Sequence, residues 1–271
     1  MDSFDTLRRR ARAVRRRVVA MSAAAHAPHV ASALSCVDIL VALYCNVARV
    51  SPATIDSPER DRIILSKGHA SAALYACLAE CGLLDASGLA SYAADGSMLA
   101  EHPSRGRPPG VEVTTGSLGH GLGLGLGLAK AARLQGRDYR VFVVLSDGEC
   151  NEGSVWEAAL WAPRHGLDNV AAIVDFNKLQ ATGRSCEITQ LAPLAEKWQA
   201  FGWDAREIDG HDFVALVDAL TAASEGRPRA LIAHTIKGKG VSFMEDDLEW
   251  HYRPPSLDDV RRATAELGEG S

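Results

Sequence analysis

Apolar strand-like runs alternate with helix-like segments through the second half of this chain. Strands that are apolar throughout and separated by helices typically form parallel sheets with helices on both faces. The predicted strands are 141–145, 170–176, 204–208 and 230–235, and the predicted helices between them are 153–166, 192–201 and 212–224. We therefore predict an α/β fold, a mostly parallel sheet flanked by helices on both faces, with ligands bound beyond the carboxyl ends of the strands.

Helical patterning dominates the first half of the chain. We find no internal repeat, and we predict that residues 1–271, including a tail over 241–271, form one domain. The stretch from Pro103 to Gly110 is predicted to be an ordered loop. The predicted helices here are 5–23, 36–48, 70–81 and 86–94, a glycine-rich helix that ends near Leu134, and a tail helix over 255–267.

Glycines recur at a spacing of four residues in the glycine-rich helix. Gly119, Gly123 and Gly127 form one series, and Gly121 and Gly125 form another. Small residues at this spacing let a helix approach its neighbour closely, so we predict close packing; a membrane GxxxG contact is the alternative.

Composition narrows the class of partner. The formal net charge of −5 gives no overall attraction to nucleic acid, and no run approaches the ~20 apolar residues that a membrane span needs. The basic cluster from Arg8 to Arg17 is interleaved with Ala and Val. This pattern predicts an amphipathic helix with a solvated basic face.

The six cysteines show no spacing typical of a zinc site. Cys77 and Cys81 stand four residues apart in an Ala/Leu helix, and buried free thiols account for them. A reducing compartment is the simplest setting for such thiols, so the predicted location is cytoplasmic.

Polar residues follow two successive predicted strands. Asp147 and Gly148 come after the strand 141–145, and Asn177 comes after the strand 170–176. A carboxylate and an amide oxygen are suitable Mg²⁺ ligands, and they leave room for diphosphate oxygens. Taken alone, Asp147-Gly148 at a strand end is more typical of a turn, and Asn177 alone is compatible with an Asx turn. Together they predict a magnesium–diphosphate site.

At these residues the sequence resembles the thiamine-diphosphate enzymes of the transketolase family. The superfamily signature is Gly-Asp-Gly followed, roughly 25–30 residues later, by Asn; here it is Ser146-Asp147-Gly148 and Asn177. The resemblance is collinear over nearly the whole chain. It extends to Ser66-Lys67-Gly68-His69-Ala70, Thr115-Gly116-Ser117-Leu118-Gly119, Glu152 to Ala158, His165 to Asn169, Gly202-Trp203, Asp209 to Asp212, and Thr235 to Gly240.

The resemblance implies a thiamine-diphosphate-binding fold and assigns cofactor and metal ligands residue by residue. Asp147, Asn177 and the Leu179 carbonyl are expected to bind Mg²⁺. Gly148 and Gly116 are expected against the diphosphate, and Leu118 against the thiamine rings. The full set expected to contact the cofactor is His69, Gly116, Ser117, Leu118, Gly148, Glu149 and Asn177.

Four histidines are the expected catalytic residues. His29, His69, His102 and His251 match family histidines that face the diphosphate, the reactive carbon or the substrate hydroxyls. Glu152 and Glu157 match acidic residues at the family's dimer interface; a solvated pair at a helix start is the alternative. Asp175 and Lys237 are further candidates for groups around the site.

Three departures from the family pattern lie around the expected cofactor and substrate site. Ser146 replaces the usual first glycine, so the turn must tolerate a Cβ beside the diphosphate. Pro28-His29-Val30-Ala31-Ser32 replaces a Gly-rich loop near the substrate, and His120 stands where Gln is usual. These changes leave the expected metal ligands in place but put ordinary sugar-phosphate specificity in doubt.

The family's full-length members continue into a pyrimidine-binding domain, which supplies the glutamate that activates the cofactor. We therefore expect this chain to be the N-terminal subunit of a split transketolase, active only with a separately encoded C-terminal subunit, as an α2β2 heterotetramer. The expected reaction transfers a two-carbon ketol unit from a ketose to an aldose, phosphorylated sugars included. The alternatives are a thiamine-diphosphate-dependent acyloin-forming synthase or lyase subunit of specialised metabolism, and a non-catalytic remnant.

Overall fold

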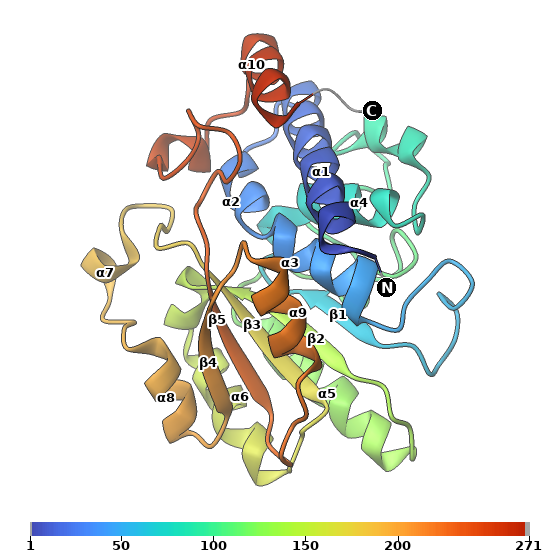
Figure 1. Cartoon of the computed structure of the whole chain (residues 1–271), viewed down its shortest axis with the longest axis vertical. Coiled ribbons are helices and arrows are strands. Elements are labelled where there is room, and N and C mark those ends of the chain that lie inside the picture. Colours follow the sequence, from blue (N-terminus) through green and yellow to red (C-terminus); the bar gives the residue numbers. More distant parts are fainter. Residues whose placement is uncertain (1, 269–271) are drawn as a thin grey trace.

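The computed structural model describes residues 2–268, and its sheet has five strands, all parallel, in the order β1-β2-β3-β5-β4 (Figure 1). Helices cover both faces of this sheet, so the predicted α/β fold is confirmed. The strands are β1 (Arg62–Leu65), β2 (Val141–Ser146), β3 (Val170–Phe176), β4 (Asp204–Asp209) and β5 (Arg229–His234).

The sheet separates two apolar cores. Alternate residues of β2 point to opposite faces, so Phe142 and Val144 lie in one core while Val143 and Leu145 lie in the other. The first core is covered by α1 (Phe4–Ala24), α2 (Val30–Ser35), α3 (Val37–Ala42), α4 (Ser71–Glu80), α9 (Phe213–Thr221) and α10 (Leu257–Leu267). The second is covered by α5 (His120–Leu134), α6 (Gly153–Arg164) and α8 (Leu194–Ala200).

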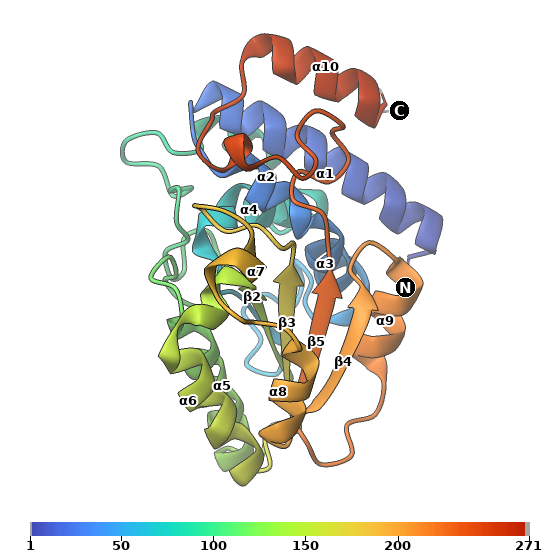
Figure 2. The same ribbon diagram turned by 90° about the vertical axis from the view of Figure 1, so that its left-hand side faces the viewer.

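Short helical turns complete the fold. The arrowheads of β3, β4 and β5 in Figure 2 point toward the end of the molecule that carries α1, α2 and α10, and β1 and β2 run parallel to them. The short elements are the π-helix η1 (Leu43–Val47), the 3-10 turns η2 (Gly68–Ala70), η3 (Ala86–Ser91), η4 (Gly148–Asn151) and η5 (Leu248–His251), and α7 (Ser185–Ile188). No helix within residues 2–268 combines the length and the apolar character needed to cross a bilayer.

Several predicted boundaries differ from the structure. The predicted helix 36–48 is wrong in outline, because the chain is already helical from Val30, breaks at Cys36 (φ −94°, ψ 6°) and ends in η1. The predicted helix 86–94 is the 3-10 turn η3. The strand β1 was not predicted, because it has only four residues and begins at Arg62.

The basic face of α1 is only partly solvated. Arg15 is buried and forms an ion pair of 2.6 Å with Asp38, and Arg10 and Arg17 both pair with Glu80 on α4. The predicted helix is therefore correct, but three of its arginines join it to neighbouring helices.

The glycines of α5 divide into two groups. A Cβ on Gly121 would lie 2.2 Å from Ser66 Oγ, and one on Gly125 would lie 2.6 Å from a methyl group of Val143. Gly123 and Gly127, by contrast, have no other residue within 4 Å of such a Cβ. Close packing against the sheet therefore depends on Gly121 and Gly125.

This contrast provides a first prediction. Gly121→Ala is expected to destabilise the fold by about 1–3 kcal/mol, because the added methyl group overpacks the contact with Ser66. Gly123→Ala is the control, expected to stabilise by about 0.5–1 kcal/mol because alanine favours the helix and meets open space. Urea unfolding measures both; equal effects at the two positions would contradict the packing interpretation.

The structure corrects the interpretation of the cysteines. Cys81 forms a disulfide with Cys45, whereas Cys77 is a buried free thiol as predicted. The error arose because Cys45 lies 36 residues away in the sequence and only the fold brings it to the end of α4.

Candidate active site

Polar segments follow four of the five strands and meet at the carboxyl edge of the sheet. Ser66–His69 follows β1, Asp147–Glu149 follows β2, Asn177–Leu179 follows β3, and Thr235–Lys237 follows β5. The register pairs Ser146 of β2 with Asp175 of β3, so the segments after these two strands lie side by side. Ligand sites of open parallel sheets occupy this edge.

Asp147 is buried and lies at the centre of this edge. Its carboxylate accepts hydrogen bonds from the Lys178 backbone N–H (2.9 Å), from Ser185 Oγ (2.7 Å) and from the Gly148 backbone N–H (2.9 Å). Burial raises the pKa of Asp147, and no ion pair within the part of the chain that the structure describes offsets it. Such a carboxylate is suited to a bound cation.

Asn177 and Leu179 direct oxygen atoms toward the same region. Asn177 Nδ2 donates to Ser35 Oγ (3.3 Å), which leaves its Oδ1 as the acceptor; Leu179 N–H donates to that Oδ1 (3.1 Å). The Leu179 carbonyl accepts from Lys237 Nζ (3.3 Å). A positive φ of 69° at Lys178 turns the backbone between the two residues.

A buried ion pair lies beneath these residues. Lys67 Nζ is 2.5 Å from Asp175 Oδ2 and donates to the Ser32 carbonyl at 2.8 Å. Asp175 also accepts from Ser35 Oγ and Thr235 Oγ1. Burial alone would raise the pKa of Asp175, but the Lys67 ammonium and these hydroxyls outweigh it and lower that pKa.

Three of the predicted histidines form one cluster. The ring centroids of His29 and His69 are 5.3 Å apart, those of His29 and His251 are 5.0 Å apart, and those of His69 and His251 are 6.2 Å apart. His29 has a positive φ of 69° and its Nδ1 is buried without a hydrogen-bond partner among the described residues. Strained non-glycine backbone and unpaired polar atoms gather at functional sites.

The cluster is neutral at physiological pH. Burial, with the positive charges of neighbouring groups, lowers the pKa of His251 to about 3 and that of His29 to about 4. The pKa of His69 is lowered well below its usual value for the same reasons. Lys237 Nζ lies 2.7 Å from His251 Nδ1, so the neutral imidazole accepts a hydrogen bond from the ammonium.

The low pKa of His251 predicts a pH dependence of stability. Between about pH 6.5 and pH 4 the unfolded chain binds a proton at this residue and the folded chain does not, so stability falls as pH falls. The expected contribution is about 1.4 kcal/mol per pH unit. Urea unfolding across this range gives the free energy of unfolding as a function of pH. The slope of this dependence should be smaller by this amount in His251→Gln than in the unchanged chain. An equal slope in both would contradict the lowered pKa of His251.

Two glycine-containing loops contact each other across the site. A Cβ on Gly68 would lie 2.6 Å from the Gly116 nitrogen, and one on Gly116 (φ 136°) would lie 2.6 Å from His102 Cδ2. The exposed His102 ring therefore packs directly on Gly116. His120 Nδ1 lies 3.2 Å from the carbonyls of Ser117 and Leu118, which ties this loop to the start of α5.

Glu149 is placed differently from the other predicted cofactor ligands. Its buried carboxylate accepts from the backbone N–H groups of Gly119 (2.8 Å) and Ser146 (3.3 Å) and from Ser66 Oγ. Ser146 Oγ in turn accepts from the Glu149 N–H at 3.1 Å, so the hydroxyl at the unusual first position stabilises the turn. Glu149 thus joins three loops.

Glu152 and Glu157 lie outside this cluster, on the exposed start of α6. Beside them is an open hollow of about 520 Å³ between α5 and α6, and its lining includes Glu157, Leu124 and Trp161. Leu124 and Trp161, which line this hollow, are 45% and 40% exposed, and Leu160, the residue before Trp161, is 57% exposed; large apolar side chains exposed in one region can mark an interaction site.

Lys67 is the charged residue of this edge whose role the sequence pattern did not reveal. Its motif resembles the family, but only the fold shows that its ammonium pairs with Asp175. A lysine two residues after the apolar segment Ile63-Ile64-Leu65, and directly before Gly68-His69, was the available signal. Three hydrogen-bonding hydroxyl residues were also not predicted, because single hydroxyl residues carry little information before the fold is known. They are Ser35, Ser185 and Thr235.

Fold and site together define an α/β domain with a candidate ligand site at the carboxyl edge of a parallel sheet. The chain belongs to the transketolase family: residues 7–270 match the family model described as the transketolase thiamine diphosphate binding domain.

Relatives of similar length support the assignment to the transketolase family. The chain is 43% identical over 267 residues to one subunit of an apulose-4-phosphate transketolase from Actinobacillus succinogenes, covering 98% of this chain and 97% of the relative. It is 39% identical over 241 residues to one subunit of a 6-deoxy-6-sulfo-D-fructose transketolase from a Clostridium species, covering 88% of this chain and 88% of the relative.

Solved structures show the same fold within longer chains. Transketolase from Campylobacter jejuni superposes with a TM-score of 0.89 at 28% identity, covering 98% of this chain and 43% of that chain. Transketolase from Leishmania mexicana gives the same TM-score and identity, covering 99% and 42%. The chain therefore spans about two fifths of these transketolases.

Proposed function

We propose that this chain is the N-terminal subunit of a two-component transketolase that transfers a two-carbon ketol unit from a ketose to an aldose. The observation that carries the proposal is the convergence of Asp147, Asn177 and the histidine cluster at one edge of the sheet. The relatives named as transketolase subunits, which match this chain over nearly all of their length, support the two-component architecture.

Asp147, Asn177 and the Leu179 carbonyl would hold Mg²⁺, and the metal would hold the diphosphate of the cofactor. Two observations fit this group: the Asp147 carboxylate is buried without an ion pair in the described chain, and the Leu179 carbonyl already accepts from the Lys237 ammonium. Oxygen donors of this kind suit Mg²⁺. Gly148 and Gly116 would lie against the diphosphate.

Thiamine diphosphate, when bound, supplies the carbanion chemistry of ketol transfer. Because His29, His69 and His251 are neutral, each ring can accept a hydrogen bond at one nitrogen and donate one at the other. They would therefore orient substrate hydroxyls through hydrogen bonds, and a ring that takes a proton would carry positive charge only until it passes the proton on. His102, which lies on Gly116, and the loop of Ser117 and Leu118 would form the opposite wall.

Glu149 would act on the cofactor through the loops that it joins, since its oxygens are taken up by Gly119, Ser66 and Ser146. A substitution there would be expected to shift the diphosphate loop.

The exposed face of α5 and α6 would contact the partner subunit. Glu157 lines the same hollow as the exposed Leu124 and Trp161, and exposed apolar side chains with a polar rim are typical of an interface. We propose an α2β2 complex with a separately encoded subunit that carries the pyrimidine-binding domain. A cytoplasmic location, where sugar phosphates are available, completes the proposal.

Co-expression with the candidate partner subunit tests this function. The purified complex should transfer ketol units between a ketose and an aldose only when thiamine diphosphate and Mg²⁺ are both present, and each chain alone should be inactive. Product analysis over panels of both sugars, phosphorylated and not, identifies the substrates. Acyloin formation from a decarboxylated 2-oxoacid, without ketol transfer, would instead support a synthase or lyase.

A further inference from the structure

Three cysteines converge at the end of α4, away from the proposed active site. Cys77 and Cys81 lie one helical turn apart at the end of α4, and Cys45 lies in η1. The three sulfur atoms lie within 4.8 Å of one another, and Cys45 is bonded to Cys81.

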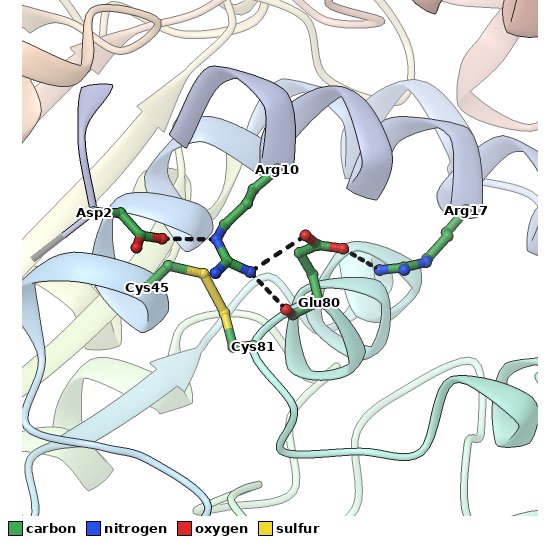
Figure 3. The surroundings of a disulfide bond; sticks show 6 residues. All are labelled: Asp2, Arg10, Arg17, Cys45, Glu80 and Cys81. Atoms are coloured by element: carbon green, nitrogen blue, oxygen red, sulfur yellow. Dashed lines mark hydrogen bonds and ion pairs between the residues drawn. A yellow bond between two sulfur atoms is a disulfide. The ribbon is translucent and has the colours of Figure 1, made fainter. Parts of the chain in front are cut away.

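The surroundings of the disulfide favour reaction at these sulfurs. Cys45 and Cys81 are only partly buried, so small reagents reach the bond, whereas Cys77 is completely buried. Arg10 extends from α1 over this region, between Asp2 and Glu80 (Figure 3). Asp2 and Glu80 pair with this guanidinium, and burial raises the pKa of the Cys77 thiol, so exchange would start by attack of a small external thiolate on the partly exposed disulfide.

Glu80, the residue before Cys81, fixes the end of α4 to α1. Its carboxylate pairs with Arg10 at 3.3 Å and with Arg17 at 2.6 Å, and its carbonyl accepts from Arg10 at 2.8 Å. These contacts do not depend on the disulfide. The end of α4, which carries Cys81, therefore keeps its place against α1 when the bond is broken.

The disulfide closes a loop that contains part of the proposed active site. The loop spans the 36-residue separation between Cys45 and Cys81, and it includes β1 and the segment Ser66–His69. Cross-linking a loop of this length restricts the unfolded chain and so stabilises the fold. The redox state of the pair should thus change the stability of the element that carries Lys67 and His69.

We propose that Cys45 and Cys81 are a reversible thiol-oxidation site that stabilises this chain when oxidised, and that the buried Cys77 beside them takes no part in the reaction. Oxidation removes two electrons and two protons from the two thiols and forms the S–S bond. A low-molecular-weight disulfide accepts them and is reduced to two thiols. Reduction by a low-molecular-weight thiol reverses each step through a mixed disulfide.

Thiol counting in the full-length chain tests the pairing. After equilibration in glutathione buffers from fully reduced to fully oxidised, free cysteines are alkylated and the peptides identified by mass spectrometry. We expect six free thiols at the reducing end and four at the oxidising end, with only Cys45 and Cys81 protected. Absence of this disulfide at every ratio, or its persistence at every ratio, would overturn the proposal.

Thermal unfolding tests the stabilising effect. The oxidised chain is expected to melt about 5–10 °C above the reduced chain. Cys45→Ser and Cys81→Ser should each abolish this difference. Cys77→Ala and Cys186→Ser are the controls, one in the cluster and one exposed elsewhere, and both should retain it.

Cys77→Ala also separates the proposal from a metal site. Three adjacent thiolates are suitable ligands for Zn²⁺. If the reduced chain binds one equivalent of Zn²⁺ tightly and Cys77→Ala loses that binding, the cluster is a metal site and the redox proposal fails. We expect no such Cys77-dependent binding.

Discussion

Replacement of Asp147 by alanine is expected to abolish Mg²⁺-dependent binding of thiamine diphosphate in the reconstituted complex. The carboxylate is the one charged oxygen among the three proposed ligands, since Asn177 and the Leu179 carbonyl are neutral. The expected loss of affinity is at least about 100-fold, or roughly 2.7 kcal/mol. Isothermal titration calorimetry with and without Mg²⁺ measures it, and retained tight binding would overturn the metal assignment.

The Asp147 carboxylate, although needed for metal binding, is expected to contribute little to the stability of the metal-free chain. Asp147 is buried, burial raises its pKa, and its partners are neutral hydrogen-bond donors. Asp147→Asn removes the buried charge, but its amide nitrogen loses one of the accepted hydrogen bonds, so the stability of the metal-free chain is expected to change by less than about 1 kcal/mol while cofactor binding weakens. Asp168→Ala, a partly exposed residue paired with Arg133, is the control and should leave binding unchanged.

Patterns that repeat along the chain made the fold predictable from sequence. The runs in β2 and β3 are apolar on both faces because both faces are buried, so their type and position could be predicted almost to the residue. The strand β1 could not, since four residues are too few to show a pattern. The break at Cys36 was also missed, because no glycine or proline marks it.

The candidate site also contains some residues that could be predicted from the sequence and others that could not. Asp147 and Asn177 were predictable as a pair because each directly follows a strand, and parallel strands end at a common edge. The Lys67–Asp175 pair was not, because its members lie 108 residues apart and neither has a local signal for the other. The disulfide between Cys45 and Cys81 was missed for the same reason. Contacts between distant segments become visible only when the fold has placed them.

The second large effect is expected when the Lys67–Asp175 ion pair, which the sequence did not predict, is broken. Lys67→Met is expected to destabilise the chain by about 3–5 kcal/mol, because it leaves the Asp175 carboxylate buried without its charged partner. Asp175 is fully buried, and its remaining donors, Ser35 and Thr235, are neutral. Urea unfolding measures the loss. Lys130→Met, at a partly buried helix position, is the control and should change stability by less than about 1 kcal/mol.

The double variant Lys67→Met/Asp175→Asn distinguishes a lost charge pair from a lost packing contact. If the cost arises from an uncompensated charge, removing that charge should restore part of the stability, and the double variant should be more stable than the sum of the single effects by about 2 kcal/mol or more. Strictly additive effects would contradict the ion-pair explanation. Because Ser35 contacts both Asp175 and Asn177, the Lys67 variant should also weaken cofactor binding even where it remains folded. A folded Lys67→Met chain that binds thiamine diphosphate normally would show that the pair supports the fold but does not position the metal ligand.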